Sequence, residues 1–346
     1  MSARRKWAWP LVPVYAAVVG AKDWLREAGL LRARHLTWPV VSVGSLAAGG
    51  AGKTPVVIAL AGMLKERGWH VDVLSRGYGR RKPGVQQVIP GAEDAAAHFG
   101  DEPVMIAARL PIPVWINPDR YDAGVQAEQA AQVSPKHRVH ILDDGFQHRR
   151  LGRTVDIVLV TAEDLTDALL PAGNRREPRG ALRRADLVVV REEEMEVVEP
   201  RVKTLMHEGA MLWTVRRKLR FPAPLFVFGA GLRPVAFCAI ARPEGFSTML
   251  QDAGCGVADT IFFADHHAYT ANDIERIVEL ATQLRATGLV TTEKDAVKLN
   301  AAMRTRLESI GPVMVVALDA EFVFPERVAR ELERRILPAP AREEPA

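Results

Sequence analysis

The strongest constraint on this chain is a strand, a loop of small residues and a helix that follow one another between residues 40 and 65. The strand reads V-V-S-V-G-S, and the loop ends at Gly52, Lys53 and Thr54. Glycines let backbone N–H groups approach phosphate oxygens, the lysine adds charge for the outer phosphates, and the threonine hydroxyl can reach Mg²⁺. A helix dipole starting near Thr54 adds positive potential, and Pro55 is tolerated in the first turn. The predicted nucleotide-binding residues are Ala47, Ala48, Gly49, Gly50, Ala51, Gly52, Lys53 and Thr54.

The loop departs from the usual phosphate-binding pattern at its first position. That pattern opens with glycine, whereas Ala47 stands there and Ala48 follows. The alternative is a glycine-rich turn between a strand and a helix. The flanking strand and helix, together with three glycines inside the loop, favour nucleotide binding.

Composition excludes several classes of protein. The chain has 346 residues, 48% of them hydrophobic and 25% charged, which suits a soluble globular protein with room for two domains. A net charge of +4 suits an anionic substrate, membrane surface or nucleic acid. No basic stripe interleaves with aromatic residues, so a nucleic-acid module is not expected. Cys238 and Cys255 lack metal-ligand spacing and are expected to be small core residues in a reducing compartment.

The N-terminal segment combines basic and aromatic residues. Arg4, Arg5 and Lys6 precede an uncharged run of 15 residues, 7–21, which contains Trp7 and Trp9. This run is shorter than the ~20 residues that span a bilayer as a helix. A cleaved export signal would separate the phosphate loop from cytosolic nucleotide. We expect either a helix in the membrane interface or a helix packed on the protein body.

Strand-like and helical segments alternate after the phosphate loop. Apolar strands are expected at residues 71–74, 114–116, 139–142, 156–160 and 187–190, with room for crossover helices between them. This alternation is typical of a parallel sheet covered on both faces. The fold class is therefore predicted to be α/β, a P-loop NTPase-like doubly wound sheet with a second, smaller α/β domain.

Two domains are expected. Residues 1–220 are expected to form the N-terminal P-loop domain, with its membrane-interface segment at about 1–30, and residues 221–346 the smaller C-terminal α/β domain. The block at 221–312 has strands expected at 225–228 and 289–292. Extended segments near 211–220 and 313–322 are expected to join the two domains. The last helix, at 325–336, can return to the N-terminal domain, and the tail after it is expected to be disordered.

Two acidic motifs could carry chemistry. Asp143 and Asp144 follow a strand, where a carboxylate commonly holds Mg²⁺ beside a phosphate loop. The alternative is an Asp-Gly turn, but two adjacent aspartates followed by Gly-Phe-Gln-His favour the metal role. Asp101 precedes a helical run at 104–110. It could accept a proton from an attacking hydroxyl, but its spacing alone favours a helix cap.

Four further motifs have two readings each. The basic loop at 74–81 could clamp an anion or be solvated, and the loop at 171–178 could be exposed or cover phosphates. His266, within D-H-H, could tune a distant carboxylate or be structural. The segment T-T-E-K-D at 291–295 could face the nucleotide or cap a helix.

Taken in order, these motifs resemble one family. V-G-S-L-A-A-G-G-A-G-K-T-P, L-S-R-G-Y-G-R, G-D-E-P, D-D-G-F-Q-H, R-E-P, D-H-H and T-T-E-K-D occur in this sequence in the order found in tetraacyldisaccharide 4'-kinases, the lipid A 4'-kinases of Gram-negative bacteria. The resemblance runs from the N-terminal segment to about residue 325. Asn174 and Arg175 stand where the family usually has Pro-Leu, so the loop before R-E-P departs from the family pattern.

The resemblance implies an activity. Family members use ATP and Mg²⁺ to phosphorylate the 4'-hydroxyl of a tetraacylated disaccharide 1-phosphate, giving lipid IVA. Asp101 would be the general base, oriented by His266, with Lys53 on the phosphates. The implied metal network is Thr54, Asp143, Asp144 and Glu177. The implied substrate contacts are Arg76, Tyr78, Arg120 and Arg176.

The same resemblance implies where the protein works. The expected partners are the acylated lipid substrate and the membrane surface, at the cytoplasmic face of the bacterial inner membrane. No nucleic acid and no obligate protein partner are expected.

Two rival functions share the phosphate loop. A membrane-cycling ATPase switch would carry a second lysine early in the loop, where this chain has Ala48. A P-loop kinase or ligase for a soluble molecule would leave the tryptophan-rich N-terminus unexplained unless that segment packs on the protein.

Overall fold

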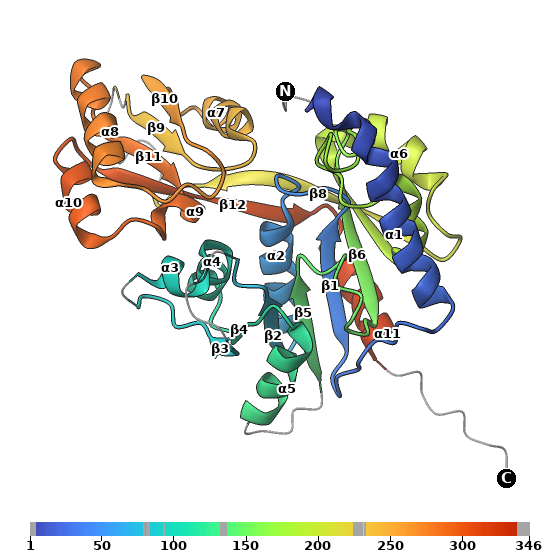
Figure 1. Ribbon diagram of the computed structural model, residues 1–346. Helices are drawn as coiled ribbons and strands as arrows, with labels where there is room; N and C mark the ends of the chain where they lie inside the picture. Colours follow the sequence, from blue (N-terminus) through green and yellow to red (C-terminus); the bar gives the residue numbers. More distant parts are fainter. Residues whose placement is uncertain are drawn as a thin grey trace, which may run out of the picture.

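The computed structural model describes residues 5–78, 80, 84–92, 94–131, 137–223, 231 and 233–337. Within these residues twelve strands form one continuous sheet, in the order β10-β9-β11-β12-β8-β7-β6-β1-β5-β2-β4-β3 (Figure 1). The sheet is mostly parallel and carries helices on its faces, so the predicted α/β, P-loop NTPase-like class is confirmed. The strand expected at 225–228, Arg4, Gly79, Arg81 and the tail after Leu337 lie outside the described residues.

The N-terminal part of the sheet contains the phosphate loop. Its strands are β1 (Val40–Ser45), β2 (His70–Ser75), β3 (Gln86–Gln87), β4 (Val114–Ile116), β5 (Arg138–Asp143), β6 (Val155–Val160) and β7 (Leu187–Arg191). All six residues of β1 and of β6 are buried. Runs of β-branched residues suit such strands because neighbours cover both of their faces. The strands predicted in this part are confirmed, with ends that differ by at most one residue.

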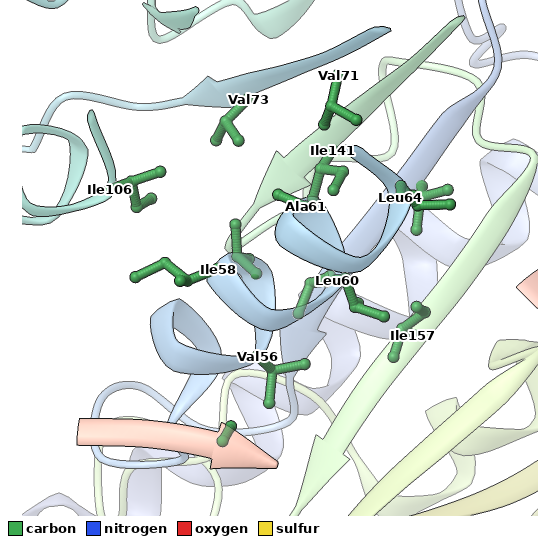
Figure 2. Close-up of a cluster of buried hydrophobic side chains, with 14 of the residues drawn as sticks. Val56, Ile58, Leu60, Ala61, Leu64, Val71, Val73, Ile106, Ile141 and Ile157 are labelled. Atoms are coloured by element: carbon green, nitrogen blue, oxygen red, sulfur yellow. The ribbon is translucent and has the colours of Figure 1, made fainter. Parts of the chain in front are cut away.

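Helices cover both faces of this part. Successive residues of a strand point to opposite faces, and Val41 and Val43 belong to the cluster under α2 (Lys53–Glu66), α4 (Asp101–Arg109) and α11 (Pro325–Ile336). Figure 2 shows apolar side chains of α2 facing strand residues such as Val71 and Ile141. The other face packs on α5 (Arg120–Ala130), α6 (Met195–Lys203) and the 3-10 helix η2 (Arg179–Arg184). This part of the chain also contains two short helices, α3 (Ala95–Phe99) and the 3-10 helix η3 (Glu192–Glu194).

A long antiparallel pair links this part to the rest of the sheet. It consists of β8 (Met211–Arg220) and β12 (Val313–Phe322), the two segments that the sequence suggested would be extended. Beyond it lie β9 (Val235–Cys238), β10 (Asp259–Phe262), β11 (Leu289–Thr292), α7 (Pro243–Asp252), α8 (Ala271–Gln283), α9 (Glu293–Ala296) and α10 (Ala301–Glu308). We call residues 233–312 the C-terminal region. Separate apolar clusters lie on its two faces.

The N-terminal helices lie on the surface. The 3-10 helix η1 (Lys6–Leu11) leads into α1 (Val12–Glu27), which has no buried residue. Asp23 pairs with Arg149 and Arg184, and the hydroxyl of Tyr15 donates to the carbonyl of Arg176 at 2.9 Å. Within the described ranges, no helix combines the length and apolarity needed to cross a membrane.

Candidate active site

The loop after β1 has the backbone of a phosphate cradle. Gly49, Gly50 and Gly52 have φ values of +71°, +68° and +88°, a region that residues with a Cβ rarely occupy. The Lys53 ammonium lies 3.2 Å from Ser45 Oγ and 3.3 Å from Asp144 Oδ1. Lys53, the first residue of α2, is therefore held beside the carboxylate of Asp144.

The loop at 171–178 packs against this cradle. The backbone N–H of Ala48 donates to Asn174 at 2.9 Å, and Arg175 forms a β-bridge with Ala47. The N–H of Arg176 donates to Leu46 at 2.8 Å. Of the two readings of this loop, the structure therefore favours a covering segment over an exposed one.

Asp143 is the last residue of β5 and Asp144 follows it, and the pKa values of their two carboxyl groups are shifted in opposite directions. Burial, helped by Glu102 and Asp144, raises the pKa of Asp143 to about 7. Burial acts in the same direction on Asp144, but the charges of Lys53 and Arg176 outweigh it and lower the pKa of Asp144 to about 2. Asp144 also has a φ of +50°, an uncommon backbone state for a residue with a side chain. One carboxylate of the pair is thus held charged beside the phosphate loop.

Four side chains were predicted to contact substrate. Arg176 donates to Asp144 Oδ2 at 2.7 Å and lies 3.3 Å from Gln147 Oε1. Arg120 is buried; burial and then the charge of Arg76 lower its pKa to about 10. Arg76 is exposed, and Tyr78 is 64% exposed with its ring centroid 5.5 Å from that of His266.

Asp101 and His266 meet although 165 positions separate them in the chain. Asp101 is the first residue of α4, and its Oδ2 lies 2.9 Å from His266 Nδ1. Asp101 Oδ1 accepts the N–H of Glu102 at 2.9 Å, but the N-cap residue of α4 is Gly100 and no side chain caps this helix, so the cap reading of Asp101 is wrong. His266 has a φ of +59°. Such rare backbone states concentrate at functional sites.

The charge states of this pair are shifted by their neighbours. Burial would raise the pKa of Asp101, but the hydrogen bond from His266 and the charges of Lys294 and Lys298 outweigh it, so that pKa is lowered. The hydrogen bond to Asp101 raises the pKa of His266, while burial and Lys294 oppose the rise. Asp101 is therefore a carboxylate at neutral pH.

The C-terminal region touches the phosphate loop directly. A Cβ added to Gly49 would lie 3.2 Å from Ala241 Cβ and 3.7 Å from Asp265 Oδ2. A Cβ on Gly50 would lie 2.6 Å from Nε of Arg242. Because Asp265 immediately precedes His266, the pair with Asp101 lies next to the phosphate cradle.

Glu177 is placed differently from the other predicted metal residues. Its carboxylate accepts from Arg184 at 3.0 Å, and burial raises its pKa. Arg184 also pairs with Asp23 of α1. In this structure Glu177 contributes to the contact with α1, and its side chain is directed to Arg184 rather than to Asp144.

The remaining donors suit a hard cation such as Mg²⁺. Asp143 Oδ1 is buried and has no hydrogen-bond partner among the described residues. Carboxylate and hydroxyl oxygens are the ligands that Mg²⁺ prefers. Across the described ranges no three His, Cys, Asp or Glu side chains form a metal-binding group.

Sequence reasoning missed several residues of this site. Gln147 donates to the carbonyl of Ser45 at 2.9 Å, and Arg191 donates to that of Gly50 at 2.7 Å. Lys294 lies between Glu102 and His266. Gln147 and Lys294 stand within quoted motifs, which was the available signal, whereas Arg191 follows an ordinary buried strand and offered none.

Comparisons with known proteins agree with the motif order. The family pattern described as Tetraacyldisaccharide-1-P 4'-kinase matches residues 4–337. A tetraacyldisaccharide 4'-kinase of Koribacter versatilis is 38% identical over 338 residues, covering 94% of this chain and 99% of that protein. One from Geobacter metallireducens is 36% identical, covering 92% and 95%.

A solved structure is similar over almost the full length. LpxK from Aquifex aeolicus, crystallised in complex with ATP, superimposes with a TM-score of 0.74 at 29% identity. The match covers 96% of this chain and 99% of that one.

Proposed function

The chain belongs to the tetraacyldisaccharide-1-phosphate 4'-kinase family, and from this premise we propose how its residues carry out phosphoryl transfer. It is an ATP-dependent kinase that transfers the γ-phosphate to the 4'-hydroxyl of a tetraacyldisaccharide 1-phosphate, a precursor of lipid A. The residue roles, the metal, the domain movement and the membrane location below are proposals.

We assign ATP to the loop from Ala47 to Thr54. Backbone N–H groups at the start of α2 would receive the phosphates, as glycine-rich loops do before helices. Lys53, now 3.3 Å from Asp144, would turn to the outer phosphates when nucleotide enters. Asp144 Oδ1 would then be available to a cation, while Oδ2 keeps its hydrogen bond from Arg176.

Thr54, Asp143 and Asp144 would hold Mg²⁺, which supplies charge neutralisation of the transferred phosphoryl group. Support comes from the unpartnered Asp143 Oδ1 and the ionised Asp144. We leave Glu177 out of the direct ligands because Arg184 holds its carboxylate.

The observation that carries the mechanism is the Asp101–His266 hydrogen bond beside the phosphate loop. Asp101 is charged and only 8% exposed, so it can accept the proton of the 4'-hydroxyl as that oxygen attacks phosphorus. His266 orients the carboxylate. Phosphoryl transfer otherwise requires alignment and charge neutralisation, which Lys53 and the loop N–H groups provide.

The test is transfer of label from γ-labelled ATP to acylated disaccharide 1-phosphate. We expect Asp101→Asn to lower turnover by about 10²- to 10⁴-fold, the usual contribution of a general base. Asp252→Asn, an exposed aspartate on α7, is the matched control and should leave turnover unchanged. Near wild-type turnover by Asp101→Asn at saturating substrates would exclude Asp101 as the base.

Arg76, Tyr78, Arg120 and Arg176 are proposed to contact the sugar and phosphate of the lipid. Arg176 supports this role because it joins Asp144 to Tyr15 of α1, between the phosphate loop and the exposed helix. Arg176→Lys would keep the charge but lose the planar fork. We expect it to raise KM for the lipid more than KM for ATP, measured in the same transfer assay.

The N-terminal helices are proposed to lie in the membrane interface, at the cytoplasmic face of the bacterial inner membrane. Trp7 is 76% exposed, Val14 61% and Trp24 63%, an apolar surface without a protein partner among the described residues. Tryptophan side chains prefer headgroup depth. Replacing Trp7 and Trp9 by serine should reduce co-flotation with vesicles, while hydrolysis of ATP stays unchanged.

The two ends of the sheet are proposed to be domains, 1–220 and 221–346, that close on the substrates, with the last helix, α11, returning to pack on the first domain. Asp101 and His266 come from opposite sides of this boundary, so the pair, formed at 2.9 Å in this structure, would be broken in an open state and re-formed on closure. Water would then be excluded from the γ-phosphate. Cross-linking or distance measurements between α4 and α8 with and without ATP would test the movement, and identical distances in both states would contradict it.

A further inference from the structure

Lys294 lies at the centre of a cluster that joins the two ends of the sheet. Its ammonium nitrogen is 3.2 Å from His266 Nε2, 3.3 Å from Glu102 Oε1 and 3.3 Å from Asp265 Oδ1. The side chain is only 17% exposed. Lys294 extends from α9, a four-residue helix after β11, and reaches α4 in the N-terminal part. It therefore touches the side of His266 opposite Asp101.

The hydrogen-bond chemistry of these partners leaves one arrangement for His266. An ammonium group has three donors and no acceptor, and an ionised carboxylate can only accept. Nε2, facing Lys294 at 3.2 Å, must therefore carry the lone pair, and Nδ1, facing Asp101 at 2.9 Å, must carry the proton. A protonated imidazole would instead direct an N–H at the ammonium.

We propose that Lys294 is a positioning residue for the transfer reaction, which holds His266 as the neutral Nδ1–H tautomer that donates to Asp101. The proposal deepens the proposed function and rests on Asp101 as the base. With His266 neutral, Asp101 receives a hydrogen bond but not a full positive charge on the same oxygen. Asp101 thus stays oriented while it remains able to accept a proton.

The charges around His266 explain why a lysine is needed. Asp101 faces the ring from α4, and Asp265 Oδ2 lies 3.8 Å from its Nε2, so two carboxylates favour the imidazolium. Glu102 pairs with Lys294 at 3.3 Å. Lys298 lies 4.0 Å from Asp101, and the ring of Tyr78 lies beside His266. Lys294 is the only cation that the described residues place in contact with the imidazole, and it is 4.0 Å from Asp101, farther than from its other carboxylate partners.

The first experiment reads the tautomer directly. Protein with ¹⁵N-labelled histidine is examined by long-range ¹H–¹⁵N correlation, and His266→Gln identifies the signals of His266 among the nine histidines. At pH 8 the wild-type protein should show His266 as the Nδ1–H tautomer. An Nε2–H tautomer or an imidazolium in the wild-type protein would overturn the proposal, even if every variant failed to fold.

Variants test whether Lys294 imposes that state. In Lys294→Met the apparent pKa of His266 should rise by about one pH unit or more, whereas Lys294→Arg should keep the tautomer. Turnover of Lys294→Met at pH 7 should fall at least tenfold, the acid limb of its pH profile should move upward, and KM for ATP should stay within about twofold. Lys203→Met, which removes a surface lysine paired with Glu199, is the matched control and should change none of these.

The outcomes distinguish a failure of the proposed role of Lys294 from a failure of the proposed role of Asp101 as the base. A normal pH profile and tautomer in folded Lys294→Met, or a failure of Lys294→Arg to restore turnover, would overturn the role of Lys294. Full turnover by Asp101→Asn would instead exclude Asp101 as the base, and the wild-type tautomer would still report whether Lys294 holds His266.

Discussion

The Asp101–His266 pair allows a quantitative prediction about how the two residues share one task. His266 Nδ1 lies 2.9 Å from Asp101 Oδ2, and the carboxylate is buried. A hydrogen bond to a charged group contributes about 1.5–3 kcal/mol, which corresponds to about a 10- to 150-fold change in rate. We therefore expect His266→Ala to lower kcat by this factor and Asp101→Asn by about 10²- to 10⁴-fold.

The double variant decides whether the residues act as a unit. If His266 acts only through Asp101, Asp101→Asn combined with His266→Ala should be no slower than Asp101→Asn alone. Independent roles would instead multiply the two losses. The assay is the initial rate of labelled lipid formation with both substrates saturating, and His207→Ala, an exposed histidine, is the control.

The pH profile supplies a second test with a defined sign. His266 and the two lysines lower the pKa of Asp101, so losing His266 must raise it. The same 1.5–3 kcal/mol corresponds to about one to two pH units. The acid limb of kcat should therefore move upward by that amount in His266→Ala. An unmoved limb, or a double variant with multiplied losses, would refute the shared task.

Three further predictions concern the loop and the core. Gly44→Ala would place a Cβ 2.5 Å from Phe146 Cβ, and it should lower the free energy of unfolding, measured in urea, by about 1–3 kcal/mol or more. Gly62→Ala, inside α2, should instead raise the free energy of unfolding by about 0.5–1 kcal/mol. Burial raises the pKa of Asp72 from 3.8 to about 7, so the folded protein keeps a proton that the unfolded chain releases. Stability should thus fall as pH rises from about 4 to 7, and Asp72→Asn should remove this loss; equal urea midpoint shifts at pH 5 and pH 8 would argue against it. Lys53→Met should lower kcat/KM for ATP by about 10²- to 10³-fold, and a smaller loss would mean that Lys53 does not reach the transferred phosphate.

Much of the fold was predictable because it depends on local pattern. The strands β1, β5, β6 and β7 are buried on both faces. Strands buried in this way are recognisable in a sequence as continuous runs of β-branched and other apolar residues. The strand, loop and helix around Lys53 have few alternative conformations, since three glycines there adopt positive φ. Helix ends were less predictable: α4 begins at Asp101, three residues before the expected run.

Placement of side chains was less predictable. Glu177 follows Arg176 directly, yet Arg176 turns to Asp144 and Glu177 turns to Arg184. Adjacent residues in an extended segment point to opposite sides, and their surroundings decide which partner each one meets. The roles of Asp101 and His266 came from resemblance to a family, since their spacing along the chain predicted only a cap and an isolated histidine.

The phosphate loop and the parallel sheet follow from the order of residues alone, because hydrogen bonds and burial act there over a few positions. The proposed role of Asp101 as proton acceptor does not, because it depends on charges that the chain brings together from α4, α9 and the loop before α8. Coulomb interactions and hydrogen bonds depend on distance in space. Only in the folded chain does Lys294 face His266 at 3.2 Å and Asp101 at 4.0 Å, and the proposed role of Lys294 rests on these two distances.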